Sequence, residues 1–141
     1  MFTHWQFYAF ASAFFAGLTA VLAKVGVANI PSNVATLIRT LVVCVFIFFL
    51  VFFRQEWINP LTLNKRSLIF LVLSGLATGL SWLLYFRALQ MGPASLVASV
   101  DKLSLLFAVA LAVIFLGEHL GVQQWIGIVL IAAGTLLVAL K

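Results

Sequence analysis

Asp101 and Lys102 are the residues of this sequence whose types and position best suit chemistry. They are adjacent charges inside an apolar run that extends over residues 94–116. In a helix that begins at the start of this run, a rise of about 1.5 Å per residue places them roughly 10 Å deep. Charged groups at membrane depth are costly and usually face a bundle interior or water. We therefore expect them either to handle substrate or protons, or to form buried structural ion pairs, each with a partner other than its neighbour.

Hydroxyl groups accompany these charges on two of the apolar runs. Ser95 and Ser99 share a helical face with Lys102, because residues three and four apart are neighbours on a helix. The run 67–89 carries a polar or phenolic face with an aromatic residue beside it, formed by Ser74, Thr78, Ser81, Tyr85 and Trp82. A tight turn joins the two runs. We predict an aqueous cavity between them, although such faces also suit helix packing.

Three more cations, Lys24, Arg39 and Arg87, lie inside apolar runs, and the first two are further candidates for substrate or proton handling. Lys24 lies near the end of the run 5–27, and Arg39 lies about one and a half turns into the run 34–53. Long basic side chains near helix ends can also reach the headgroups, which is the alternative role for Lys24. The excess of embedded cations over carboxylates favours an anionic or zwitterionic substrate.

The remaining composition argues against an enzyme and against nucleic acid as a partner. The sequence has 2 histidines, both near the expected membrane edges, and a single cysteine, Cys44. It shows no metal-ligand cluster and no nucleophile–base spacing, so we expect neither a metal site nor a cofactor. The formal net charge is +5, but the basic residues are scattered singly and form no basic stripe.

The elements that must position these residues are long apolar runs at residues 5–27, 34–53, 67–89, 94–116 and 125–140. The chain is 65% hydrophobic and 8% charged, whereas soluble domains are about 45–50% apolar and about 25% charged. A transmembrane helix needs about 20 mostly apolar residues, and a strand has only about 4–8. We therefore predict an all-α, polytopic membrane protein with five transmembrane helices, surrounded by lipid and forming one domain over residues 1–141.

Small residues predict where these helices touch, since helices in lipid associate through small and polar side chains. Gly75 and Gly79 form a GxxxG pair, and Gly127 and Gly134 give the last helix a small face with heptad spacing. These four glycines are the predicted packing positions.

The order of several short segments resembles the EamA-type half-repeat of the drug/metabolite transporter superfamily. The segments are ALQMGPA at residues 88–94, FLGE at 115–118, QWIG at 124–127 and IAAG at 131–134. DKLS at 101–104 is similar to the short, single-repeat bacterial and archaeal members. The resemblance implies a secondary transporter of a prokaryotic inner or plasma membrane, moving a small metabolite by alternating access. Many relatives have a proline in the middle of the fourth helix; this chain has none there, which argues against an unwound-helix site.

The resemblance also implies that five helices are half of a ten-helix, inverted-repeat transporter. The binding site of such proteins lies at the midplane between the halves, so a half needs a partner, most simply a second copy. Three basic residues near helix ends on each expected side give little orientation preference, which allows an antiparallel homodimer. A non-transporting membrane scaffold or assembly partner and a passive pore are the alternatives.

Overall fold

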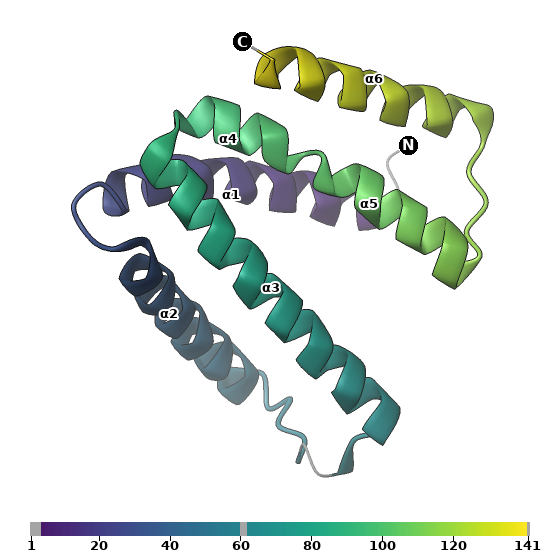
Figure 1. The fold of residues 1–141 in the computed structure, drawn as a ribbon. Helices are drawn as coiled ribbons and strands as arrows, with labels where there is room; N and C mark the ends of the chain where they lie inside the picture. Colours follow the sequence, from purple (N-terminus) through teal and green to yellow (C-terminus); the bar gives the residue numbers. More distant parts are fainter. Residues whose placement is uncertain (1–3, 60–61, 141) are drawn as a thin grey trace. The chain divides into compact units, whose positions relative to one another are not determined.

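The computed structural model describes residues 4–59 and 62–140, and its helices follow the apolar runs (Figure 1). The elements in chain order are α1 (His4–Gly26), α2 (Ser32–Phe53), α3 (Lys65–Met91), α4 (Ala94–Asp101), α5 (Ser104–Leu111), η2 (Ala112–Leu116) and α6 (Val122–Ala139). The pieces α4, α5 and η2 together make one span, so the described residues contain five helical spans long and apolar enough to cross a membrane. The predicted all-α, five-span fold is confirmed.

Large apolar side chains cover the outside of these spans. In α2, the most apolar 18-residue window has only 11% of its residues buried. Phe46 is 64% exposed and Phe53 is 78% exposed. Exposed aromatic surface of this kind is unfavourable in water, whereas acyl chains accommodate it. The exterior therefore fits a lipid environment, as the composition predicted.

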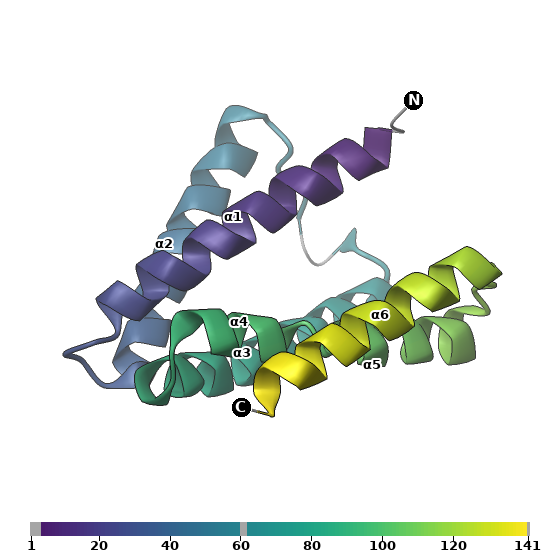
Figure 2. The same cartoon turned by 90° about the horizontal axis from the view of Figure 1, so that it is seen from above.

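Close packing divides the chain into two compact units. One unit combines the residues up to Leu22 with those from Met91 onward, and the other extends from Ala23 to Gln90. In the first unit, α6 runs back alongside α4 and contacts both α4 and α5 (Figures 1 and 2). The second unit contains the last residues of α1 with α2 and α3.

The second unit has its core where α1 ends, α2 begins and α3 ends. Val27 and Leu89 are fully buried there, and Phe86 is only 3% exposed. Thr36 is buried in the same region, and its hydroxyl donates a hydrogen bond of 2.9 Å to the carbonyl of Ser32. This bond within the helix satisfies the hydroxyl, so a polar side chain can lie among apolar ones.

The fourth span follows the predicted run but is not one continuous α-helix, because α4 ends at Asp101 and α5 begins at Ser104. The amide of Lys102 donates to the carbonyl of Ser99 at 3.0 Å, and that of Leu103 donates to Val100 at 2.9 Å. Hydrogen bonds to the third residue back define a 3₁₀ turn, which has poorer bond geometry than an α-helix. The interruption therefore arises without proline, directly beside Asp101.

The span ends in the π-helical turn η2, and the turn into α6 follows. Gly117 ends η2 with a left-handed φ of 66°, a conformation that costs glycine nothing. Gln124 caps α6, because its Oε1 accepts the amide of Gly121 at 2.6 Å. Glu118 is exposed and does not cap this helix.

Candidate functional site

Asp101 and Lys102 lie at the interruption of the fourth span. Asp101 is the last residue of α4, and Lys102 is the C-cap residue that begins the 3₁₀ turn. Both side chains are exposed, and neither forms an ion pair with another residue in the part of the chain that the structure describes. A carboxylate and an ammonium inside a membrane span need polar surroundings. Their placement suits contact with substrate, protons or a second polypeptide.

The two serines predicted beside Lys102 are close to it on the same helix. The hydroxyl of Ser99 donates a hydrogen bond of 2.8 Å to the carbonyl of Ser95. This bond uses the one donor of Ser99 and leaves its oxygen lone pairs as acceptors. The face formed by Ser95, Ser99 and Lys102 can therefore accept and donate hydrogen bonds at the same time.

The predicted polar face of α3 borders a groove shared with α2. This open groove has a volume of about 430 Å³ and is lined by Thr40, Val43, Cys44, Leu71, Ser74, Gly75, Thr78, Gly79 and Trp82. The hydroxyl of Thr78 donates to the carbonyl of Ser74 at 2.9 Å. Ser81 is exposed and Tyr85 is half-buried, but neither lines the groove. The predicted cavity between the third and fourth spans stays a prediction, because those spans belong to different units.

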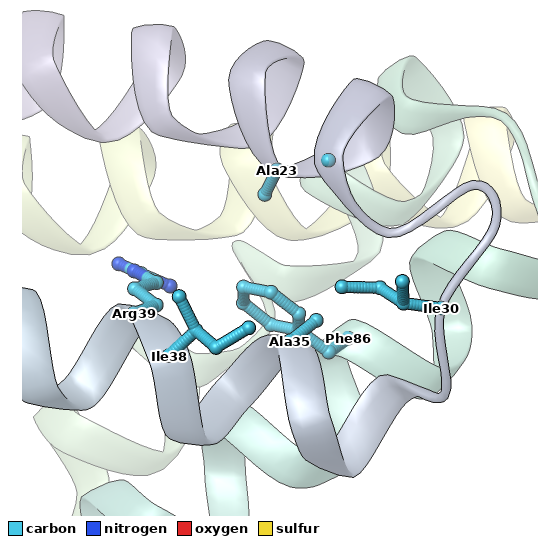
Figure 3. Close-up of a pocket in the computed structure, with 7 residues that line it drawn as sticks. Ala23, Ile30, Ala35, Ile38, Arg39 and Phe86 are labelled. Carbon is cyan, nitrogen blue, oxygen red and sulfur yellow. The ribbon is translucent and has the colours of Figure 1, made fainter.

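Arg39 is held by two aromatic rings of α3. Its guanidinium carbon lies 4.4 Å from the centre of the Trp82 ring and 5.4 Å from that of Phe86. Trp82 and Phe86 are four residues apart, so they lie on one face of α3 and both rings contact the same guanidinium. Arg39 and Phe86 also line a smaller hollow in this unit, with a volume of about 180 Å³ (Figure 3).

Lys24 connects the end of α1 to the end of α3. Its ammonium donates a hydrogen bond to the carbonyl of Leu89, so it places a positive charge at the negative end of the α3 dipole. Gln90 completes the connection, since its amide nitrogen donates to the carbonyls of Val27 at 3.2 Å and Ile30 at 2.7 Å. This arrangement gives Lys24 a structural contact, and its predicted role in substrate or proton handling stays a prediction.

The four predicted packing glycines are not held by close neighbours. A Cβ atom added at Gly75, Gly79, Gly127 or Gly134 would meet no atom within 4 Å outside its own helix turn among the described residues. Their predicted role in helix packing is therefore untested within one chain. It remains a prediction.

Two features of the site were missed by sequence reasoning. The bonds of Gln90 to the α1–α2 turn have no sequence signal apart from the position of Gln90 in the segment ALQMGPA. The aromatic contacts of Arg39 could have been suspected from the sequence, because Trp82 and Phe86 are four residues apart on α3. That spacing alone does not tell which helix supplies the cation.

Comparison with known proteins covers almost the whole chain. The sequence pattern of the EamA-like transporter family matches residues 3–140. An uncharacterized transporter encoded in the cobO 3′ region of a Sinorhizobium species is 53% identical over 135 residues, which cover 96% of each chain. An uncharacterized protein of Methanocaldococcus jannaschii is 32% identical over 83 residues, covering 59% of this chain and 61% of the relative. No solved structure matches this chain.

Proposed function

The chain belongs to the EamA-like transporter family, and we propose that it is a secondary transporter that moves a small polar metabolite by alternating access. Family membership, the five spans and the bacterial relative make it an integral transport protein of the bacterial inner membrane. They point to a transporter rather than an enzyme.

The observation that carries the proposal is the coincidence of two charges with a helix interruption. Asp101 and Lys102 lie inside the span Ala94–Leu116 and beside the 3₁₀ turn at Leu103. Charges inside a span are typical of substrate and proton pathways, and interrupted helices form the midplane sites of many transporters. Asp101 accordingly exchanges a proton or binds a cationic group, and Lys102 binds an anionic group.

The functional assembly is an antiparallel homodimer. A five-span chain supplies one half of the ten-span arrangement, and a second copy in the opposite orientation supplies the other. The small faces at Gly127 and Gly134 are unoccupied by close neighbours among the described residues, which leaves room for another helix. Asp101 then meets its partners across the interface between the copies.

Loss of transport in charge variants tests the function. We propose reconstituting the purified protein in vesicles that contain a pH-sensitive dye, and adding amino acids, carboxylates, sugars and nucleosides in turn. The wild type is expected to give a substrate-dependent pH change. Asp101→Asn and Lys102→Met are expected to lower the initial rate at least tenfold, because each removes a charge that the substrate or proton needs.

Matched variants outside the span provide the controls. Glu118→Gln and Lys65→Met remove the same kinds of charge from exposed positions at span ends, and they should keep the wild-type rate. Helical circular dichroism and the elution volume must be the same for all variants. Full transport by Asp101→Asn would contradict the assigned role of this carboxylate.

A further inference from the structure

Arg39 has no carboxylate partner in its own unit. It lies seven residues into α2, or roughly 10 Å along the helix. Glu56 is the one carboxylate residue of the sequence between Ala23 and Gln90, and it pairs with Arg54 at 3.7 Å. A cation at this depth needs an opposite charge or polar surroundings. Any carboxylate that pairs with Arg39 must therefore come from outside this unit.

The aromatic contacts hold the guanidinium without using its hydrogen-bonding capacity. Trp82 and Phe86 offer the faces of their rings, which attract the cation but accept no conventional hydrogen bond. A guanidinium has five N–H donors in a fixed, planar fork. The rings thus orient this fork while leaving donors available for a bidentate ligand.

The hollow beside Arg39 is small and otherwise apolar. It has a volume of about 180 Å³, and its other walls include Ala23, Ile30, Ala35, Ile38 and Phe86 (Figure 3). Pockets for drug-sized ligands usually measure about 300–1,000 Å³. The space therefore suits the charged end and a short apolar portion of a small molecule.

We propose that this hollow, the Arg39 pocket, binds the carboxylate of a small monocarboxylate with a short apolar body. A carboxylate matches the guanidinium fork in geometry and neutralises its single charge. A phosphate dianion would leave an uncompensated negative charge among apolar walls, which is costly. The assignment of the ligand as transported substrate rests on the proposed function, whereas binding itself does not.

Fluorescence of Trp82 can report on the pocket directly, because this ring contacts the guanidinium that binds the ligand. Trp5, Trp57 and Trp125 are replaced by phenylalanine, which leaves Trp82 as the single tryptophan. The full chain in detergent is titrated with acetate, butyrate, octanoate, butyramide and inorganic phosphate. We expect a saturable signal with acetate or butyrate, none with neutral butyramide, and at least tenfold weaker binding of octanoate and phosphate.

Substitutions at Arg39 connect this signal to the proposed contact. Arg39→Met is expected to weaken carboxylate binding at least tenfold. Arg39→Lys keeps the charge but loses the fork, so it should bind with intermediate affinity, and it also serves if the methionine variant does not fold. Arg54→Met, which removes an exposed arginine at the end of the same helix, should bind as the parent does.

Several results would overturn the proposal. Equal binding of butyramide and butyrate would show that the charge is irrelevant, and equal binding by the parent and both Arg39 variants would remove Arg39 from the site. Tighter binding of phosphate would contradict the charge argument, and tighter binding of octanoate would indicate a lipid-like acid instead of a small metabolite. Absence of any saturable fluorescence signal would also contradict the proposal.

Binding in detergent separates this inference from the transport proposal. Carboxylate binding that depends on Arg39, together with no flux of any tested carboxylate in vesicles, would support the pocket and contradict transport. Flux that depends on Asp101, together with no carboxylate binding at Arg39, would support transport and contradict the pocket.

Discussion

At the scale of single residues, three of the cations inside apolar spans have different surroundings. Lys24 donates to the last turn of α3, Arg39 lies against aromatic rings, and Lys102 is exposed beside a 3₁₀ turn. A cation on a helix carbonyl has a structural role that a neutral donor can partly replace. A cation whose donors are available, as in Arg39, or one that is exposed inside a span, as in Lys102, is better placed to bind a ligand.

Gln90 provides the clearest test of a structural role at this scale. Its amide joins the end of α3 to two carbonyls of the α1–α2 turn. A hydrogen bond between neutral groups contributes about 1 kcal/mol, and a buried carbonyl left without a donor costs about 1–3 kcal/mol. Gln90→Leu should therefore lower the free energy of unfolding by roughly 2 kcal/mol, as measured by denaturant titration in mixed micelles.

A matched substitution checks that this loss comes from the two carbonyl contacts. Gln123 is an exposed glutamine in the first turn of α6, and Gln123→Leu should change the free energy of unfolding by less than about 0.5 kcal/mol. If both variants unfold at the same denaturant concentration as the wild type, the contacts of Gln90 do not contribute to stability.

At the scale of elements, run length and apolar composition were enough to predict the spans. The predicted run 34–53 and the helix Ser32–Phe53 differ by two residues at one end, because the apolar pattern and the helix reflect the same lipid thickness. The interruption at Lys102 and Leu103 could not be predicted this way. Neither residue is a helix breaker, and the 3₁₀ bonds depend on how the chain is packed.

The candidate site was predictable in its residue types but not in its contacts. Depth along a run singled out Asp101 and Arg39, since a charge is unusual there whatever the packing. The partner of Arg39 lies on another helix, more than 40 positions away in sequence at Trp82. Periodicity on one helix carries no information about which helix faces it, so these contacts required the structure.

The interruption of the fourth span predicts a local difference in hydrogen exchange. Bonds of a 3₁₀ turn have poorer geometry, and the polar side chains of Asp101, Lys102 and Ser104 attract water to this segment, whereas residues 126–132 are all apolar. Amides of residues 101–106 should therefore exchange at least tenfold faster than those of residues 126–132 in the middle of α6. Mass spectrometry of the protein in lipid nanodiscs can measure both segments in one sample, so α6 serves as the internal control.

Equal protection of the two segments would contradict a locally weakened span. Fast exchange confined to residues 101–106 would agree with a hinge at which α4 and α5 change their relative angle. Such a hinge would place the motion of alternating access next to the charges proposed to bind the substrate.

At the scale of the whole molecule, a five-span chain poses the question of its orientation. Three basic residues, Arg54, Lys65 and Arg66, flank the connection between the second and third spans. Lys24 and Arg87 lie near span ends on the opposite side of a five-span topology, and Lys141, which is outside the described residues, follows the last span in the sequence. Because orientation follows the excess of Lys and Arg on the cytoplasmic side, this balance permits both orientations. An antiparallel pair can then form from a single gene product.

Biasing the charge balance tests whether both orientations are needed. Ala28→Lys with Asn29→Lys adds two positive charges to the connection after α1, and Ile58→Lys with Leu63→Lys adds two to the connection after α2. All four side chains are exposed, and the carbonyls that Gln90 binds are unaltered. Each double variant should insert in one orientation only, opposite to that of the other variant.

The oligomeric state of these variants tests the antiparallel assembly. Expressed alone, each double variant should elute as a monomer. Expressed together, the two should form dimers, because each copy again meets a partner of opposite orientation. The substitutions Cys44→Ala and Gln55→Cys leave a single cysteine, and labelling of that cysteine reports the orientation in each case. A double variant that is uniformly oriented and still forms a transporting dimer by itself would contradict the antiparallel assembly, because all its subunits would then be parallel.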